Sequence, residues 1–249
     1  MEPFTPPVAT QAWWDTILGT GLFAKIILVV LFFFSVISWA IIIRKLFLFH
    51  AVRRENRILL SLFQHRRSAQ QFHKAVADYK NSPLAKVLAS GLQEWANLKK
   101  LSLANPEIHS ETKLPTNYSR LAAVLPNVQE AMNRTGSVEL ERIERFLPFL
   151  ATVSSVSPFL GLLGTVWGVL SALINVKAIP VVTLQVIAPG VSDALVTTVA
   201  GLLVAIPALM FYNYFVGKVR DLTSEVERFI SEVLGDFRKE MVLSEEIRH

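Results

Sequence analysis

Hydrophobic residues concentrate in three long stretches of the chain, and the segments between and after them alternate polar and apolar residues. The three stretches are residues 22–43, 146–176 and 193–216. A helix needs about 20 apolar residues to cross the hydrocarbon core of a bilayer, and each stretch is long enough. The only charged residues within them are Lys25 and Asp193, each near one end. The pattern therefore predicts three transmembrane helices.

The two long polar segments, residues 44–145 and 217–249, show the apolar spacing of amphipathic helices. Residues 101–119 are rich in Pro, Asn, Ser and Thr, which is typical of a linker. The helical pattern then resumes and reaches the second span, so we expect one long helix there with Pro148 at the junction. The predicted fold class is all-α: an integral membrane protein with three transmembrane helices and long cytoplasmic helical extensions.

Lys and Arg are distributed unevenly along the chain. Seventeen of the 25 lie between residues 44 and 145, and six follow residue 216. Positively charged loops stay on the cytoplasmic side of a membrane. We therefore expect residues 44–145 and the C-terminal segment to lie inside. The N-terminal segment 1–21 and the turn 177–192 are then outside.

The composition excludes several functions. The chain of 249 residues is 52% hydrophobic and 18% charged, and its net charge of +5 comes from basic residues that flank the spans. This placement reflects membrane topology and not nucleic-acid binding. There is no cysteine, the five histidines form no spaced metal pair, and no Gly-rich phosphate loop precedes a helix. We therefore expect neither an enzyme nor a bound cofactor or metal.

Small residues recur every three or four positions in the second and third spans, which invites close approach of another helix. The stripe in the second span is expected to contain Ser154, Pro158, Gly161, Thr165, Gly168 and Ala172. The stripe in the third span contains Gly190, Ala194, Thr197, Gly201, Ala205 and Ala208. Gly161, Gly164, Gly168 and Gly201 are the predicted packing residues, and Pro158 and Pro207 are the predicted kinks.

Four polar residues stand out within these two spans: Thr165, Asp193, Thr197 and Thr198. A polar or acidic residue in a membrane helix is a candidate functional site. Two simpler interpretations remain open. Thr165 could bond only to its own helix backbone, and Asp193 could be the N-terminal cap of the third span. On an ideal helix Asp193 and Thr198 lie on opposite sides of the small-residue stripe.

The motifs GLLGTVWGV (Gly161 to Val169) and APGVSDALVTTVAGLLVAIPALMFYN (Ala188 to Asn213) resemble the TolQ/ExbB/MotA family of bacterial inner-membrane motor subunits. SWAIIIRK (Ser38 to Lys45) and TLQVIAPG (Thr183 to Gly190) place the chain nearest the TolQ-type members. The resemblance covers all three spans and is weak in residues 101–119. By motif, Thr165 and Thr198 match the pore threonines of the family, and Asp193 stands where the family usually has glutamate.

The resemblance implies a multi-pass protein of the bacterial inner membrane with a periplasmic N-terminus. It implies a homopentameric ring around the membrane helices of a single-span TolR-like partner that carries a membrane aspartate, with force passed on through a TolA-like protein. By the resemblance, Thr165, Thr198 and Asp193 would line the proton pathway. Helical geometry adds Thr197, which lies nearer the centre of the small-residue stripe than Thr198, and the sequence leaves the choice between these two threonines open. Two alternatives are kept: an ExbB-type subunit that energises outer-membrane nutrient transport, and a passive membrane scaffold.

Overall fold

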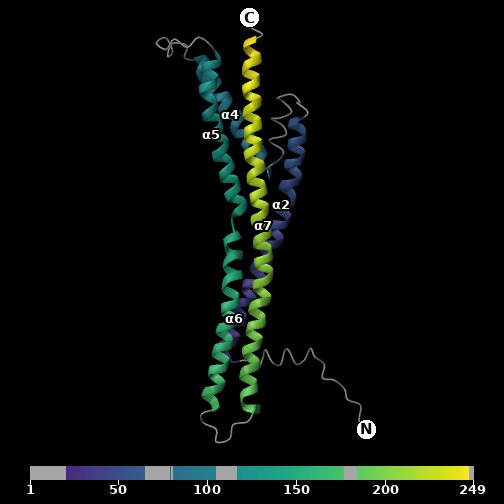
Figure 1. The fold of residues 1–249 in the computed structure, drawn as a ribbon, viewed down its shortest axis with the longest axis vertical. Helices are drawn as coiled ribbons and strands as arrows, with labels where there is room; N and C mark the ends of the chain where they lie inside the picture. Colours follow the sequence, from purple (N-terminus) through teal and green to yellow (C-terminus); the bar gives the residue numbers. More distant parts are fainter. Residues whose placement is uncertain (1–20, 65–78, 80, 105–116, 177–183, 247–249) are drawn as a thin grey trace, which may run out of the picture. The chain divides into compact units, whose positions relative to one another are not determined.

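The computed structural model describes residues 21–64, 79, 81–104, 117–176 and 184–246, and these residues form long helices without any strand (Figure 1). The helices are α2 (Leu22–Gln64), α4 (Pro83–Ala104), α5 (Asn117–Glu144), α6 (Leu147–Val176) and α7 (Leu184–Glu246). Three stretches of these helices are long and apolar enough to cross a membrane. The predicted all-α membrane fold is therefore confirmed.

The chain divides into two compact units. We call the first the membrane unit, which comprises residues 1–44 and 146–215. The second, the bundle unit, comprises residues 45–145 and 216–249. Helices α2 and α7 each contribute one part to both units.

In the membrane unit, α2 packs through aromatic rings against both other helices. The rings of Phe23 and Trp167 have centroids 4.5 Å apart, and those of Phe34 and Phe149 are 6.1 Å apart. Trp39 lies edge-on to Phe211 of α7 at 6.2 Å. Most remaining large apolar side chains of these helices are exposed, among them Phe32, Phe159, Leu203 and Met210. Exposure of this kind suits a lipid-facing surface or a contact with another membrane helix.

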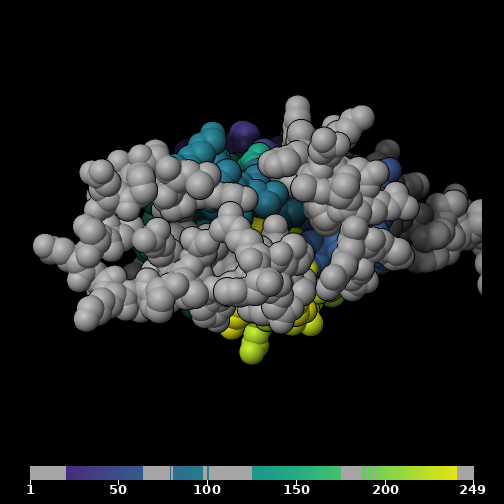
Figure 2. All heavy atoms as spheres, turned by 90° about the horizontal axis from the view of Figure 1, so that it is seen from above, coloured from purple at the N-terminus to yellow at the C-terminus, as the bar shows by residue number. Residues whose placement is uncertain are grey.

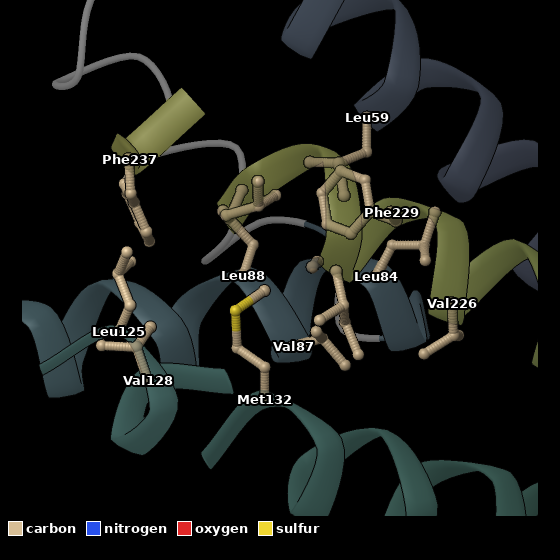
Figure 3. Close-up of a cluster of buried hydrophobic side chains, with 13 residues drawn as sticks. Leu59, Leu84, Val87, Leu88, Leu125, Val128, Met132, Val226, Phe229 and Phe237 are labelled. Atoms are coloured by element: carbon tan, nitrogen blue, oxygen red, sulfur yellow. The ribbon is translucent and has the colours of Figure 1, made fainter. Parts of the chain in front are cut away.

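In the bundle unit, α4, α5 and the parts of α2 and α7 that belong to this unit share a hydrophobic core (Figure 3). The end-on view of Figure 2 shows atoms of α4 in blue-green and atoms of the C-terminal part of α7 in yellow. Burial of these side chains supplies the hydrophobic stabilisation of the bundle. The core consists of Leu59, Leu84, Ala85, Val87, Leu88, Leu125, Val128, Met132, Val226, Phe229, Ile230, Val233 and Phe237.

A buried polar network joins three helices of the bundle unit. The Ser82 hydroxyl accepts a hydrogen bond from the amide of Ala85 at 3.2 Å, so Ser82 caps the N-terminus of α4. The same hydroxyl donates to Asn56 Oδ1 of α2 at 2.7 Å. Asn56 Nδ2 in turn donates to Glu225 Oε2 of α7 at 3.1 Å. Because Asn56 is 1% exposed, its two bonds fix the helices to each other at this level.

The structure corrects two expected boundaries. The helix expected to run from the polar segment into the second span is interrupted at Arg145 and Phe146, where Phe146 has a φ of 75°. Pro148 explains the end of α5 at Glu144, because a proline ring in a continuous helix would clash with the carbonyl four residues earlier. The third membrane helix begins at Leu184, so the last nine residues of the expected turn 177–192 are helical.

The expected linker is also shorter than the composition suggested. Residues 101–104 belong to α4 and residues 117–119 belong to α5. Residues 105–116 lie outside the described part of the chain.

Candidate functional site

Helices α6 and α7 approach each other at backbone distance in the membrane unit. A Cβ atom placed on Gly201 would lie 2.5 Å from the carbonyl oxygen of Ser157 and 3.2 Å from the Cα of Gly161. A Cβ placed on Gly161 would lie 3.0 Å from the carbonyl oxygen of Thr197 and from the Cα of Thr198. Such distances leave no room for a side chain, so glycine is required here for the close approach.

The contact continues toward the other end of the two helices. A Cβ placed on Gly168 would lie 2.9 Å from the carbonyl oxygen of Gly190 and 3.0 Å from Ala194 Cβ. A Cβ on Gly190 would lie 2.8 Å from Ala172 Cβ. Rising residue numbers on α6 therefore meet falling numbers on α7, and the two helices run antiparallel (Figure 1).

We call this contact the glycine seam. Its members on α6 are Ser157, Gly161, Gly164, Gly168 and Ala172, and its members on α7 are Gly190, Ala194, Thr197 and Gly201. The four predicted packing glycines all lie in the seam. The stripe expected on α6 was centred differently, because it included Ser154, Pro158 and Thr165, which are half-buried beside the seam.

Thr197 lies in the middle of the seam and is fully buried. Its hydroxyl donates to the carbonyl of Ala194 at 2.7 Å, and a Cβ placed on Gly164 would overlap this hydroxyl. The side chain is enclosed between the two helices, which argues against the expected pore-lining position for Thr197. The residue fills the space that Gly164 leaves open.

Thr165 and Thr198 flank the seam on the same side. Thr165 directly follows the seam residue Gly164, and Thr198 directly follows the seam residue Thr197. When two helices run antiparallel, the residues that follow facing seam positions point to the same side of the helix pair. The Thr198 hydroxyl donates across the seam to the carbonyl of Gly161 at 3.2 Å. The Thr165 hydroxyl donates to the carbonyl of Leu162 at 2.7 Å. This bond lies within α6 and agrees with the simpler interpretation of Thr165. It is the only hydrogen bond of the Thr165 hydroxyl to any described residue.

Asp193 lies in the third turn of α7, because the helix begins at Leu184. The interpretation of Asp193 as an N-terminal cap is therefore wrong. Position 193 directly precedes the seam residue Ala194, so on an ideal helix it lies on the opposite side of the seam from Thr198. The placement of its side chain is outside the described part of the structure.

Two buried serines were missed by the sequence reasoning. Ser157 is 0% exposed and Ser38 is 3% exposed, and neither hydroxyl has a hydrogen-bond partner among the described residues. A serine within an apolar stretch is the only sequence signal for such a group. Lys45 is also buried, and its ammonium donates to the carbonyl of Ile143 in the bundle unit.

The described residues contain no group of three or more His, Cys, Asp or Glu side chains that could hold a metal ion. Pro158 lies inside α6 and Pro207 lies inside α7. Whether either proline bends its helix stays a prediction.

Comparison with known proteins identifies the family of the chain. Residues 79–228 match the family described as the MotA/TolQ/ExbB proton channel family. The chain is 31% identical to the Tol-Pal system protein TolQ of Haemophilus influenzae, over 88% of this chain and 90% of that protein. It is 29% identical to TolQ of Pseudomonas aeruginosa, over 93% and 94% of the two chains. It is 28% identical to the biopolymer transport protein ExbB of Salmonella typhimurium, over 89% and 84%. The chain therefore belongs to the MotA/TolQ/ExbB proton channel family.

Proposed function

We propose that this chain is the ring subunit of a Tol-Pal-type motor in the bacterial inner membrane. In this role it couples the proton motive force, together with a TolR-like single-span partner and a TolA-like protein, to outer-membrane integrity and to constriction during division. The observation that carries the proposal is the pair of half-buried threonines, Thr165 and Thr198, on one side of a glycine seam in apolar helices. The ring is expected to contain five copies, with the N-terminus periplasmic.

The hydrogen bonds of the two threonines suggest how they act on a partner carboxyl group. Both hydroxyls donate to backbone carbonyls, which can only accept, so each oxygen offers lone pairs to a neighbouring group. A protonated carboxyl group can donate to such an oxygen, whereas an ionised carboxylate can only accept. The observed arrangement therefore favours the protonated partner. Stabilising the ionised partner requires the hydroxyls to rotate and release the carbonyls of Leu162 and Gly161.

Asp193 is assigned a separate part in this mechanism. The side chain is one methylene shorter than the glutamate that the family usually has at this position, and the position lies on the other side of the seam from Thr198 on an ideal helix. We assign it to proton entry or release and not to the threonine pair. The ionised carboxylate is costly inside a membrane, which is consistent with a functional role.

The ExbB-type function is the second candidate, because ExbB relatives match at 26–28% identity over most of the chain. In that case the same chain would energise nutrient uptake across the outer membrane through a different partner. A passive membrane scaffold is the third candidate function, and a scaffold would not require the hydroxyl group of either threonine.

The test compares three threonine-to-valine variants in a strain that lacks its own copy of the gene. Thr165→Val and Thr198→Val remove a hydroxyl and keep the shape, and we expect both to assemble but to leave cells detergent-sensitive and chained. Thr152→Val is the matched control, since Thr152 is exposed on α6 and bonds only its own helix at Pro148. Co-purification with the single-span partner monitors assembly.

If the Thr165→Val, Thr198→Val double variant is fully functional, the threonine hydroxyls take no part in proton transfer. The passive scaffold would then be the function that agrees with the result. Normal outer-membrane integrity combined with lost growth on a nutrient taken up by energised receptors would favour the ExbB-type function instead. Thr165→Ser and Thr198→Ser retain the hydroxyl and are expected to retain activity.

A further inference from the structure

The exposed surface of α2 changes from apolar to basic within a few turns. Large apolar side chains are exposed along α2 as far as Leu46 and Phe47, and Phe47 is 74% exposed. The next exposed residues on the same side are His50, Arg53, Arg54 and Arg57. Their spacing of three or four residues from Phe47 onward places them on one face of the helix. We call these four residues the basic face of α2.

The three arginines of the basic face make no ion pair with any described residue. The nearest acidic residue in sequence, Glu55, accepts two hydrogen bonds from Asn81, at 2.9 Å and 2.8 Å. Five of the six charged residues between Arg44 and Gln64 are basic. A face of exposed, unpaired arginines carries a positive potential that an anionic partner would neutralise.

The basic face begins about two turns beyond the predicted span 22–43 and directly follows the exposed apolar residues Leu46 and Phe47. Arg53 lies six residues after Phe47, which is about 9 Å along a helix axis. Side chains on a helix lean toward its N-terminus, so the arginines of α2 lean back toward the apolar part of the helix. Long arginine side chains also extend toward a membrane interface when their stems lie along an apolar surface.

We propose that the basic face of α2 binds the headgroups of anionic phospholipids in the leaflet next to the C-terminal half of this helix. Clusters of basic residues directly after a transmembrane helix are attracted to anionic lipid surfaces. Charge complementarity and the adjacent exposed apolar stretch select a lipid over a soluble anion, because the stretch ending at Phe47 would contact acyl chains while the arginines contact phosphate. The proposal does not depend on the motor function.

The experiment measures lipid binding by the full chain purified in a neutral detergent. Phosphatidylglycerol and phosphatidylcholine are titrated separately, and bound lipid is counted by native mass spectrometry. We expect the parent chain to prefer phosphatidylglycerol. The variant Arg53→Gln, Arg54→Gln, Arg57→Gln is expected to lose on the order of 100-fold in apparent affinity for phosphatidylglycerol, since each basic residue near an anionic surface contributes roughly fivefold.

Two matched variants separate position from net charge. Arg228→Gln, Arg238→Gln, Lys239→Gln removes the same number of exposed positive charges from the C-terminal part of α7 and is expected to keep the preference. Replacing the three α2 arginines by lysine keeps the charge and is expected to keep most of the affinity. Melting in neutral detergent without lipid checks that every variant is folded.

An equal loss in the α7 variant would overturn the proposal, because binding would then follow overall charge. It would also be overturned if inorganic phosphate at the same concentration displaced phosphatidylglycerol. The same holds if the α2 variant lost self-association while retaining its lipid preference, since the face would then contact protein.

Discussion

At the residue scale, the absence of a side chain is as important as any functional group. Gly161, Gly164 and Gly201 let the backbones of α6 and α7 approach closely, and Thr197 fills the space opposite Gly164. The close approach also brings the Gly161 carbonyl within reach of the Thr198 hydroxyl. The seam therefore sets the position of one of the two candidate pathway threonines.

Gly164→Ala tests the seam with a single methyl group. The new Cβ would overlap the Thr197 hydroxyl and lie 2.6 Å from Thr197 Cβ, so the helices must separate. We expect a loss of about 1–3 kcal/mol in the free energy of unfolding, as for other overpacked sites. Thermal melting of the purified chain in detergent is the measurement.

Gly217→Ala is the control for this substitution. A Cβ on Gly217 of α7 would have no neighbour within 4 Å, and alanine is favoured over glycine in a helix by about 1 kcal/mol. We expect Gly217→Ala to melt at the same temperature or higher. A Gly164→Ala variant that melts like the parent would mean that the seam is not closely packed.

At the element scale, the helices of the bundle unit are aligned by both apolar and polar contacts. The apolar core alone permits a helix to slide by one turn, because similar side chains recur at helical spacing. The chain of bonds from Ser82 through Asn56 to Glu225 has no equivalent one turn away in the described residues. We infer that this network selects the register of α2, α4 and α7. The ion pair of Lys86 with Glu139, at 2.7 Å, adds a similar constraint between α4 and α5.

Asn56→Asp turns the network into a pH-dependent one. The introduced carboxyl group still accepts from Ser82 but faces the Glu225 carboxylate, which Asn56 contacts at 3.1 Å. The like charge and the burial raise the pKa of the introduced group above its unfolded value of about 3.9. Below about pH 4 the introduced group is protonated in both states, so the free energy of unfolding stays close to that of the parent. As the pH rises, the free energy of unfolding of the variant falls below that of the parent, by about 1.4 kcal/mol for each unit by which folding raises the pKa.

Chemical denaturation of the parent and of this variant at pH 4.5 and pH 8 measures the effect. Asn81→Asp is the matched control, since it faces Glu55 at an exposed site where water screens the charges. We expect its difference between the two pH values to be much smaller. Equal pH dependence of both variants would contradict the buried network.

At the scale of the whole molecule, charge and hydropathy divide the chain into a membrane unit and a bundle unit. The bundle unit contains most of the Lys and Arg residues, and the membrane unit is almost free of charge. Both α2 and α7 run from one unit into the other without a break.

The orientation of the chain is tested with introduced cysteines, since the sequence contains none. Gly19→Cys and Ala178→Cys should react with a membrane-impermeant thiol reagent in spheroplasts, because the positive charges keep the opposite segments inside. Asn105→Cys should react only after the cells are lysed. Labelling of Asn105→Cys in sealed cells would reverse the proposed topology.

The sequence was sufficient for the three membrane helices and for most of the bundle core. Bilayer thickness sets the length of an apolar run, so the spans can be counted without any tertiary contact. Leu84, Val87, Val226 and Phe229 were identifiable as a buried face because amphipathic periodicity depends only on the helix itself. The family motifs likewise pointed to Thr165 and Thr198.

The choice of the packing face on α6 required the folded structure. Small residues occupy two overlapping stripes on this helix, and they differ by a rotation of about 40° on an ideal helix. Sequence spacing cannot choose between them, because the choice depends on where Thr197 and Gly201 of α7 fit. The same holds for Thr197 and Thr198: adjacent threonines are chemically equal, and only the position of the partner helix buries one and leaves the other at the edge.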